Sequence, residues 1–409
     1  MEPIAKKWLT QAENCLRILK DVSDALQKGT PADRTLAKIY RENRCYGSRD
    51  RQFFYLAIFA WFRWYAYLRL LPDDPAKQLL AALVTDGVDP IPPAMAALAG
   101  DPDFNYPRLT TPQERFKAFT GVDVTNVPLV PEWTLPMFAE GAEERYLPLL
   151  GSRSPLWVRV LPGREVCVQQ EWRNAGLTFT PHHSIPGAFR FPNERVKFDA
   201  MKSWKAGAFE VQDLSSQCIG IAAGAEEGED WLDACAGGGG KTLQLAAMMN
   251  GKGSITVYDI RERKLDELEE RAARTPYGKM IRRETEQKSY DGILVDAPCS
   301  SSGRWRRNPD GRWALTPEQV AEINRAQLEI LCRRALQVRP GGKLVYGTCS
   351  VFAVENQLTI QKFLAEHPDF EPVPFVSPVT GMQTDGMLQT FSGDGDCDGS
   401  FVAVLRRKK

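Results

Sequence analysis

The sequence lacks the features that mark membrane-spanning, zinc-binding and strongly charged proteins. Its longest apolar run, residues 53–62, has 10 residues, about half of the length that a bilayer crossing needs. The 9 cysteines are an odd number and form no Cys-x-x-Cys pair of the kind used in zinc knuckles or thioredoxin-type redox sites. The 52 basic side chains are matched by 52 acidic ones, so net charge gives no overall attraction to nucleic acid. We therefore expect a cytoplasmic protein with no metal site and no membrane contact, and a monomer as the simplest oligomeric state.

The chain has the length and apolar content for several folded domains. Its 409 residues, 43% of them apolar, suggest two or three domains. Residues 1–125 carry apolar side chains at three- and four-residue steps, which predicts an all-helical domain. The proline-containing stretch 126–150 is expected to be a linker, and 151–210 a small α+β, RRM-like subdomain. From 211 to 409 strands and helices alternate, which predicts an α/β domain with a parallel, Rossmann-like sheet.

Hydrophobic patterning locates the main elements of the α/β domain. The expected strands are 231–234, 254–259, 292–296, 343–348 and 398–405. The expected helices are 242–249, 261–274 and 317–338. A capping box, Thr316-Pro317-Glu318-Gln319, opens the last helix, with proline at its first position.

A glycine-rich segment, Asp233–Thr242, follows the first of these strands and precedes a helix. Glycines at this place let the backbone approach a nucleotide-like ligand closely. A phosphate-binding Walker A loop is the competing interpretation, because Gly240-Lys241-Thr242 matches its end. That motif also needs a glycine at position 235, where this chain has cysteine, so a P-loop NTPase is disfavoured. The candidate cofactor contacts in the loop are Cys235, Ala236, Gly237, Gly238, Gly239, Gly240 and Lys241.

An acidic residue, Asp259, ends the next expected strand, about 20 residues beyond the loop. Doubly wound folds place at this position the carboxylate that binds the ribose hydroxyls. A tight turn followed by an ordinary surface acid has the same spacing, and both interpretations stay open. For the adenine side of such a ligand no carboxylate stands out, and Glu284 and Glu286 are the candidates.

Two cysteines, Cys299 and Cys349, follow two further expected strands within polar loops. In a parallel sheet both lie at the carboxyl edge, on the same side as the glycine loop. Either cysteine alone could be a packing residue, but the pair next to Asp296 indicates covalent catalysis. A thiolate that adds to carbon 6 of cytosine makes carbon 5 nucleophilic toward a methyl sulfonium. Asp296 would hold the base through its ring nitrogen and amino group.

The motifs around these residues resemble those of the Nop/Sun family of RNA cytosine-5 methyltransferases. They occur in the order 209–217, 233–242, Asp296-Ala-Pro-Cys299-Ser300, Arg307-Asn308-Pro309-Asp310, 341–350 and Glu355-Asn356. The helical start, with Ser48-Arg49-Asp50-Arg51, resembles the NusB-like domain of the bacterial Sun (RsmB-type) ribosomal RNA enzymes. The resemblance is strong in the second half of the chain and loose elsewhere.

The resemblance implies a substrate, a cofactor and a set of roles. The substrate would be RNA, most of all small-subunit (16S) ribosomal RNA, and the cofactor S-adenosylmethionine. Cys349 would be the nucleophile on carbon 6, and Cys299 would assist release of the methylated RNA from the covalent adduct. The glycine loop, Asp259 and Asp296 would contact S-adenosylmethionine.

Three positions depart from the family pattern. The family's Ala-Pro-Gly-Gly is Ala236–Gly240 here, and the loss of a proline predicts a more flexible loop. The family's adenine-side aspartate has no clear counterpart, and Ser301 stands where the family usually has glycine. Because no thiol is lost, we expect an active enzyme whose cofactor binding is weakened.

Two stretches combine basic and aromatic residues, a pattern suited to phosphate contact and base stacking on unpaired RNA. The stretch 189–205 is equally well explained as a solvated loop. The stretch 302–313 directly follows Cys299 and is the favoured RNA contact, through Arg304, Trp305, Arg306, Arg307, Arg312 and Trp313. The alternative function is an RNA-binding ribosome-assembly factor that has this fold but binds its cofactor poorly.

Overall fold

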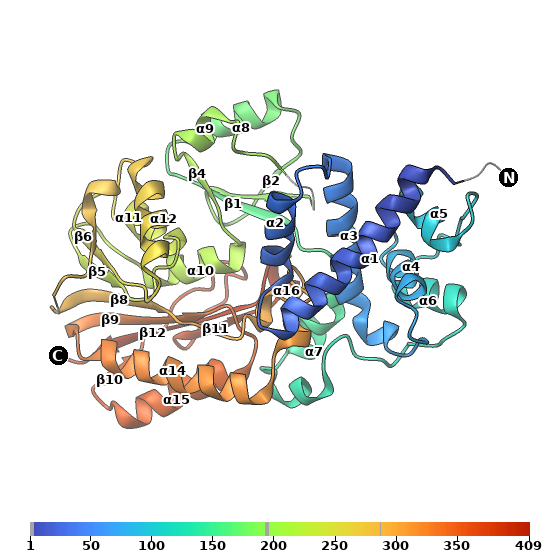
Figure 1. The fold of residues 1–409 in the computed structure, drawn as a ribbon. Coiled ribbons are helices and arrows are strands. Elements are labelled where there is room, and N and C mark those ends of the chain that lie inside the picture. The colour runs from blue at the N-terminus through green and yellow to red at the C-terminus, as the bar shows by residue number, and fades with distance from the viewer. Residues whose placement is uncertain (1–3, 193–195, 287) are drawn as a thin grey trace. The chain divides into compact units, whose positions relative to one another are not determined.

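The computed structural model of the chain describes residues 4–192, 196–286 and 288–409 (Figure 1). Among those residues, no helix has the length and the apolar character that crossing a bilayer requires. The chain forms two compact units. The first contains the chain up to Pro136, Leu147–Ser152 and Trp305–Thr316. The second contains Met137–Tyr146, Arg153–Arg304 and Pro317–Lys409.

These units differ from the expected domains. The expected linker, 126–150, is divided between the two units. The expected α+β subdomain, apart from Gly151 and Ser152, shares the second unit with most of the α/β domain. Residues 305–316, expected in the α/β domain, belong to the helical unit instead. Sequence patterning did not indicate this exchange, because it follows the chain locally and 305–316 packs against residues far away in sequence.

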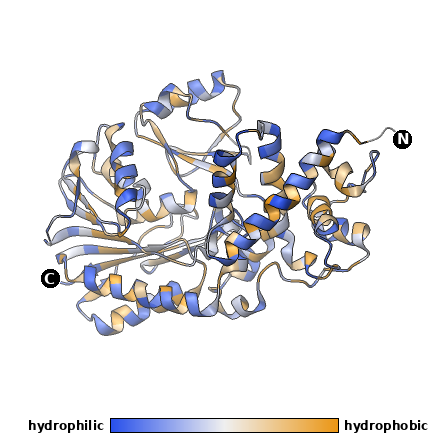
Figure 2. Cartoon of the chain, in the orientation of Figure 1, coloured by the Kyte–Doolittle hydropathy of each residue, from blue (hydrophilic) through white to orange (hydrophobic). Residues whose placement is uncertain are grey.

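The first unit is helical. Aromatic α3 supplies its centre, with Phe54, Ile58 and Trp64 buried. Helix α1 buries Cys15 and Leu19 against the same core, and Figure 2 shows hydrophilic and hydrophobic residues mixed along it, as in an amphipathic helix. The helices are α1 (Lys6–Gln27), α2 (Ala32–Glu42), α3 (Ser48–Leu68), α4 (Pro75–Thr85), α5 (Pro93–Ala99), α6 (Pro112–Thr120), α13 (Gly311–Ala314) and the 3₁₀ turn η2 (Leu147–Gly151). Their likeness to NusB stays a prediction.

A central sheet organises the second unit. Its strand order is β10-β12-β9-β8-β5-β6-β7, with β11 paired to β12. Strands β5 to β9 run parallel, whereas β12 is antiparallel to β9. The strands are β5 (Asp230–Asp233), β6 (Ser254–Val257), β7 (Ile281–Arg283), β8 (Tyr290–Asp296), β9 (Val338–Thr348), β10 (Phe370–Pro372), β11 (Met387–Thr390) and β12 (Ser400–Arg407).

Helices cover both faces of this sheet (Figure 1). On one face lie α10 (Leu214–Ala223), α11 (Gly240–Met248) and α12 (Glu262–Ala273), which contribute Ile219, Leu243 and Leu268 to the core. On the other face lie α14 (Pro317–Ala335) and α15 (Gln357–Glu366), which contribute Leu331 and Phe363. The expected α/β, Rossmann-like fold class is therefore confirmed.

A small antiparallel sheet, in the order β2-β3-β1-β4, belongs to the same unit. Its core surrounds Trp172, which packs among Phe189, Phe191 and Phe209. The elements are β1 (Leu156–Val160), α8 (Glu165–Asn174), β2 (Thr180–Pro181), β3 (Ala188–Phe191), α9 (Lys202–Lys205) and β4 (Phe209–Val211). Short connecting elements of the chain are η1 (Glu132–Met137), α7 (Ala142–Arg145), η3 (Gly278–Met280), η4 (Ser302–Arg304), η5 (Ala353–Glu355) and α16 (Ser392–Gly395).

Candidate active site

Four parallel strands deliver the chemically active residues to one edge of the central sheet. From β5 the chain proceeds to β6 and β7 on one side, and then returns to β8 and β9 on the other. Open α/β folds bind ligands at such a reversal, beyond the carboxyl ends of the strands. Here β5 leads into the glycine loop, β6 into Asp259, β8 into Asp296 and Cys299, and β9 into Cys349.

The structure brings the two cysteines together, although 50 residues separate them in the chain. Cys299 Sγ and Cys349 Sγ lie 3.2 Å apart. The hydrogen bond from Cys299 lowers the pKa of Cys349 from its ordinary value of 9.0 to about 7, against the effect of burial, and the charge of Arg304 acts in the same direction. The same hydrogen bond, together with burial, raises the pKa of Cys299 well above its ordinary value. Of the two thiols, Cys349 is therefore the one that ionises more readily, and Cys299 is the one that keeps its proton.

Ser301 occupies a backbone conformation that explains why glycine is usual there. Its φ of +57° lies in the left-handed region, which costs an L-residue free energy and glycine almost none. In return the Ser301 hydroxyl lies 3.4 Å from Cys349 Sγ, and its hydrogen bond contributes to the lowered pKa of Cys349.

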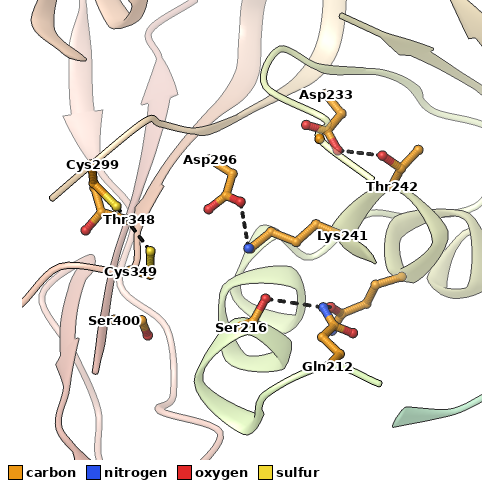
Figure 3. A network of polar contacts seen from close by, with 12 residues as sticks. Gln212, Ser216, Asp233, Lys241, Thr242, Asp296, Cys299, Thr348, Cys349 and Ser400 are labelled. Atoms are coloured by element: carbon orange, nitrogen blue, oxygen red, sulfur yellow. Dashed lines mark hydrogen bonds and ion pairs between the residues drawn. The ribbon is translucent and has the colours of Figure 1, made fainter. Parts of the chain in front are cut away.

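Lys241 and Asp296 form an ion pair next to the sulfurs, with Nζ and Oδ2 2.8 Å apart (Figure 3). Burial alone would lower the pKa of Lys241, but the charge of Asp296 and its hydrogen bond raise it, so the ammonium stays protonated. Next to Lys241 in the chain, Thr242 Oγ1 donates to Asp233 Oδ2 at 2.7 Å. Burial raises the pKa of Asp233 to about 7.

The glycine loop is held by side chains from outside it. The Gly237 N–H donates to Asp259 Oδ2 at 2.8 Å, Arg271 donates to the Gly238 carbonyl, and Arg159 Nη2 donates to the Gly240 carbonyl at 3.3 Å. These contacts supply order that four glycines lack by themselves. Neither arginine was among the sequence candidates, because Arg159 on β1 and Arg271 on α12 belong to no motif.

Within the loop, glycine is required most clearly at Gly239. Its φ is +85°, and a Cβ there would lie 2.5 Å from Leu268 Cγ. By contrast, a Cβ at Gly240 would meet no atom within 4 Å. The loop and Asp259 thus form a side-chain-free cradle facing an acid, an arrangement that fits a nucleoside ligand.

The two acidic candidates, Asp259 and Glu284, have different hydrogen-bond partners. Asp259 is buried, and although burial opposes ionisation, hydrogen bonds from Arg261 and from the Gly237 N–H lower its pKa. Glu284 follows β7 directly, and Arg334 donates to its two carboxylate oxygens at 2.8 and 3.0 Å. The adenine-side role of Glu284 stays a prediction.

The expected RNA contact in 302–313 needs correction. Trp305 is 1% exposed, Arg306 6% and Arg312 0%, so these three side chains are not available for base stacking or phosphate contact. The reason is packing within the helical unit, where Arg312 donates to the Arg63 carbonyl and Trp313 Nε1 to the Phe62 carbonyl.

The other basic residues of the two stretches that the structure describes are at least partly exposed to solvent. Arg304 is 46% exposed at its side chain and lies 3.8 Å from Asp398, while Arg307 is partly buried. In the second stretch Lys197, Lys202 and Lys205 are exposed and Arg190 is paired with Asp396. Arg195 of that stretch lies outside the described residues. An RNA contact through these side chains stays a prediction.

Glu355 and Asn356 form a sequence motif that by itself predicts no role for either residue. The structure buries both beside the cysteines. Thr348 Oγ1 donates to Asn356 Oδ1 at 2.7 Å, and Asn356 Nδ2 donates to the Ser350 carbonyl at 2.9 Å. The side-chain amide of Asn356 thereby holds the residues before and after Cys349.

Comparisons with known proteins agree with this geometry. The model of the family described as 16S rRNA methyltransferase RsmB/F matches residues 221–406. Probable ribosomal RNA small subunit methyltransferase B of Bacillus subtilis is 37% identical over 217 residues, which are 49% of this chain and 48% of that protein. The chain thus spans about half the length of this relative.

A longer match is found in Klebsiella pneumoniae. Its ribosomal RNA small subunit methyltransferase B is 31% identical over 296 residues, 69% of this chain and 67% of that protein. The crystal structure of PH0851 covers 96% of this chain and 99% of its own with a TM-score of 0.73, and at 21% identity it shows the shared fold. On the match to the Klebsiella protein and to the family model, the chain belongs to the 16S rRNA methyltransferase RsmB/F family.

Proposed function

We propose that the chain is an S-adenosylmethionine-dependent RNA (cytosine-5) methyltransferase that acts on 16S ribosomal RNA. The observation that carries the proposal is the thiolate–thiol pair, Cys349 and Cys299, with its sulfurs 3.2 Å apart beside the Lys241–Asp296 ion pair. A pyrimidine methyltransferase needs one thiol to form a covalent bond with the base and a means to break it.

The cofactor would be held by the glycine loop and Asp259, whose cradle fits a nucleoside. The cofactor supplies an electrophilic methyl group. Asp259 would accept hydrogen bonds from the ribose. Gly239 lets the loop pack directly against Leu268, which fixes the path of the backbone that would line the ligand. In this arrangement Arg271 and Arg159 set the shape of the loop before the ligand binds.

The reaction on the base uses the residues of β8 and β9. The Cys349 thiolate forms a bond from Sγ to carbon 6 of cytosine, and the displaced electron pair makes carbon 5 nucleophilic. Asp296 would face the base, and its carboxylate, paired with Lys241, can accept a hydrogen bond from the amino group. After methylation, a base, which can be a water molecule, would remove the proton from carbon 5. The electron pair of that C–H bond would re-form the double bond between carbons 5 and 6, and the bond between Sγ and carbon 6 would break with its electrons returning to Sγ. Cys299, as the protonated neighbour, stabilises the departing Cys349 thiolate.

The test is methyl transfer to a defined RNA. Purified protein is incubated with radiolabelled S-adenosylmethionine and 16S ribosomal RNA from a strain that lacks the protein. Bisulfite sequencing of that RNA before and after treatment maps any 5-methylcytosine. We expect one or a few cytosines to become protected, and these to be unmodified in the deletion strain.

A ribosome-assembly factor without methyl transfer is the alternative. Calorimetric titration with S-adenosylmethionine separates the two functions. Micromolar binding is expected for the enzyme, whereas absence of binding together with tight RNA binding would favour the assembly factor.

A further inference from the structure

A buried carboxylate lies behind the two cysteines. Glu355, in η5, is 0% exposed. Its Oε1 accepts from the Ser300 N–H at 2.8 Å and from Gln327 Nε2 at 3.0 Å, and its Oε2 accepts from the hydroxyls of Ser300 and Ser350. A buried carboxylate is costly to the fold unless it is hydrogen-bonded in this way.

The donors to this carboxylate come from both cysteine loops. Ser300 directly follows Cys299, and Ser350 directly follows Cys349. Gln327, on α14, also donates to the carbonyl of Pro298, the residue before Cys299, at 2.9 Å. The Glu355 side chain thereby connects the segments that follow β8 and β9 and supports the backbone of both cysteine loops.

From this connection we propose that Glu355 is a positioning residue, whose carboxylate holds the Cys299 and Cys349 loops at the spacing that keeps their sulfurs in contact. The proposal rests on the proposed function for its catalytic meaning, since contact between the sulfurs matters for breaking the covalent adduct. Its structural content is independent of any RNA.

The charge of Glu355 has a second consequence. It raises the pKa of Cys299, after the larger effects of the Cys349 hydrogen bond and of burial. The charged groups that act on Cys349 are Arg304, Asp296 and Lys241, and Glu355 is not among its main influences. The carboxylate therefore favours a protonated Cys299 beside an ionised Cys349, the state in which Cys299 can donate its hydrogen bond.

Two substitutions of Glu355 separate the effect of side-chain length from the effect of charge. Glu355→Asp keeps the charge but is one methylene shorter, so it cannot span both loops. Glu355→Gln keeps the reach but loses the charge, and its amide offers no second acceptor oxygen. Glu329→Gln, an exposed position on α14, is the matched control. Gln327→Met, which removes a single donor, replaces the Glu355 variants if these do not fold.

The first measurement is thiol reactivity in the protein alone. The alkylation rate of Cys299 and Cys349 is followed by mass spectrometry between pH 5 and 10. In Glu355→Asp we expect the midpoint for Cys349 to rise from about 7 toward 9.0, because Cys299 is no longer held in contact. In Glu355→Gln we expect faster alkylation of Cys299 at high pH. Diamide, a thiol oxidant, should join the two cysteines about 10²-fold more slowly in Glu355→Asp.

The second measurement is the covalent RNA adduct in denaturing gels, which should accumulate in both variants while the affinity for S-adenosylmethionine is unchanged. Unchanged alkylation profiles and diamide rates in folded Glu355→Asp and Glu355→Gln would overturn the proposal. If wild-type protein methylates no RNA, the proposed function fails, but the alkylation profiles still decide the role of Glu355.

Discussion

The two halves of the site, the glycine loop and the cysteine pair, are stabilised in different ways. The loop contains almost no side chains of its own, and Asp259, Arg159 and Arg271 hold its backbone from outside. The cysteine pair lies in loops rich in serine, which bond inward to one buried carboxylate, Glu355. Damage to the first half should therefore weaken ligand binding, and damage to the second should alter the chemistry while leaving binding intact.

The largest expected effect comes from the cysteines. Cys349→Ala should abolish methyl transfer, because no thiolate remains to attack carbon 6. Cys299→Ala should instead accumulate a protein–RNA adduct that survives denaturing gels. Both variants should bind S-adenosylmethionine like the wild type in calorimetry. Normal turnover by Cys349→Ala would show that the roles are assigned wrongly.

The second prediction concerns the glycine loop. Gly239→Ala forces a side chain into the left-handed region and against Leu268, which costs the fold about 3 kcal/mol unless the loop moves. Because the moved loop must return to its original shape to bind, we expect S-adenosylmethionine binding to weaken by up to roughly 10²-fold. Gly240→Ala is the control, since its Cβ meets nothing within 4 Å. Equal dissociation constants for the two variants would mean that loop shape does not govern binding.

A third prediction is the pH dependence of the chemical step. The Cys349 thiolate is the reactive form, and its pKa of about 7 lies below the ordinary 9.0. The single-turnover rate should fall about tenfold per pH unit below this pKa and level off above it, because protonation removes the nucleophile. Ser301→Gly should move the midpoint upward, since the hydroxyl no longer stabilises the thiolate. A flat profile between pH 6 and 8 would exclude a thiolate formed in this range.

Much of the fold was predictable because hydrophobic periodicity is local. The expected strand 292–296 lies within β8, and the helix opened by Thr316 begins at Pro317 as α14. The sequence analysis did not predict β7 and β10, because each has three residues, too few to show a hydrophobic pattern. The glycine loop and both cysteines could be found because each sits at a strand end within a motif, and Asp259 because it follows a strand at the expected spacing from the loop.

What the sequence could not reveal depends on long-range contacts. Trp305 and Arg312 combine residue types typical of RNA contact, yet tertiary packing buries them. Arg271 is one charged residue among many on α12, and its function as a loop brace appears only in three dimensions. Glu355 shows the same limit, because the Glu355-Asn356 motif does not indicate which hydrogen-bond donors the fold brings to the carboxylate.

The smallest expected effect tests the contact between Arg271 and the glycine loop. Arg271→Met removes the hydrogen bond to the Gly238 carbonyl and should weaken S-adenosylmethionine binding by about tenfold, the equivalent of one charge-assisted hydrogen bond. It also leaves buried Glu210 without its ion-pair partner, which lowers the free energy of unfolding. Adding Glu210→Gln should restore thermal stability without restoring affinity, because only the loop contact acts on the ligand. If affinity returned with stability, Arg271 would support the fold rather than the loop, and the cradle would owe its shape to Asp259 and Arg159.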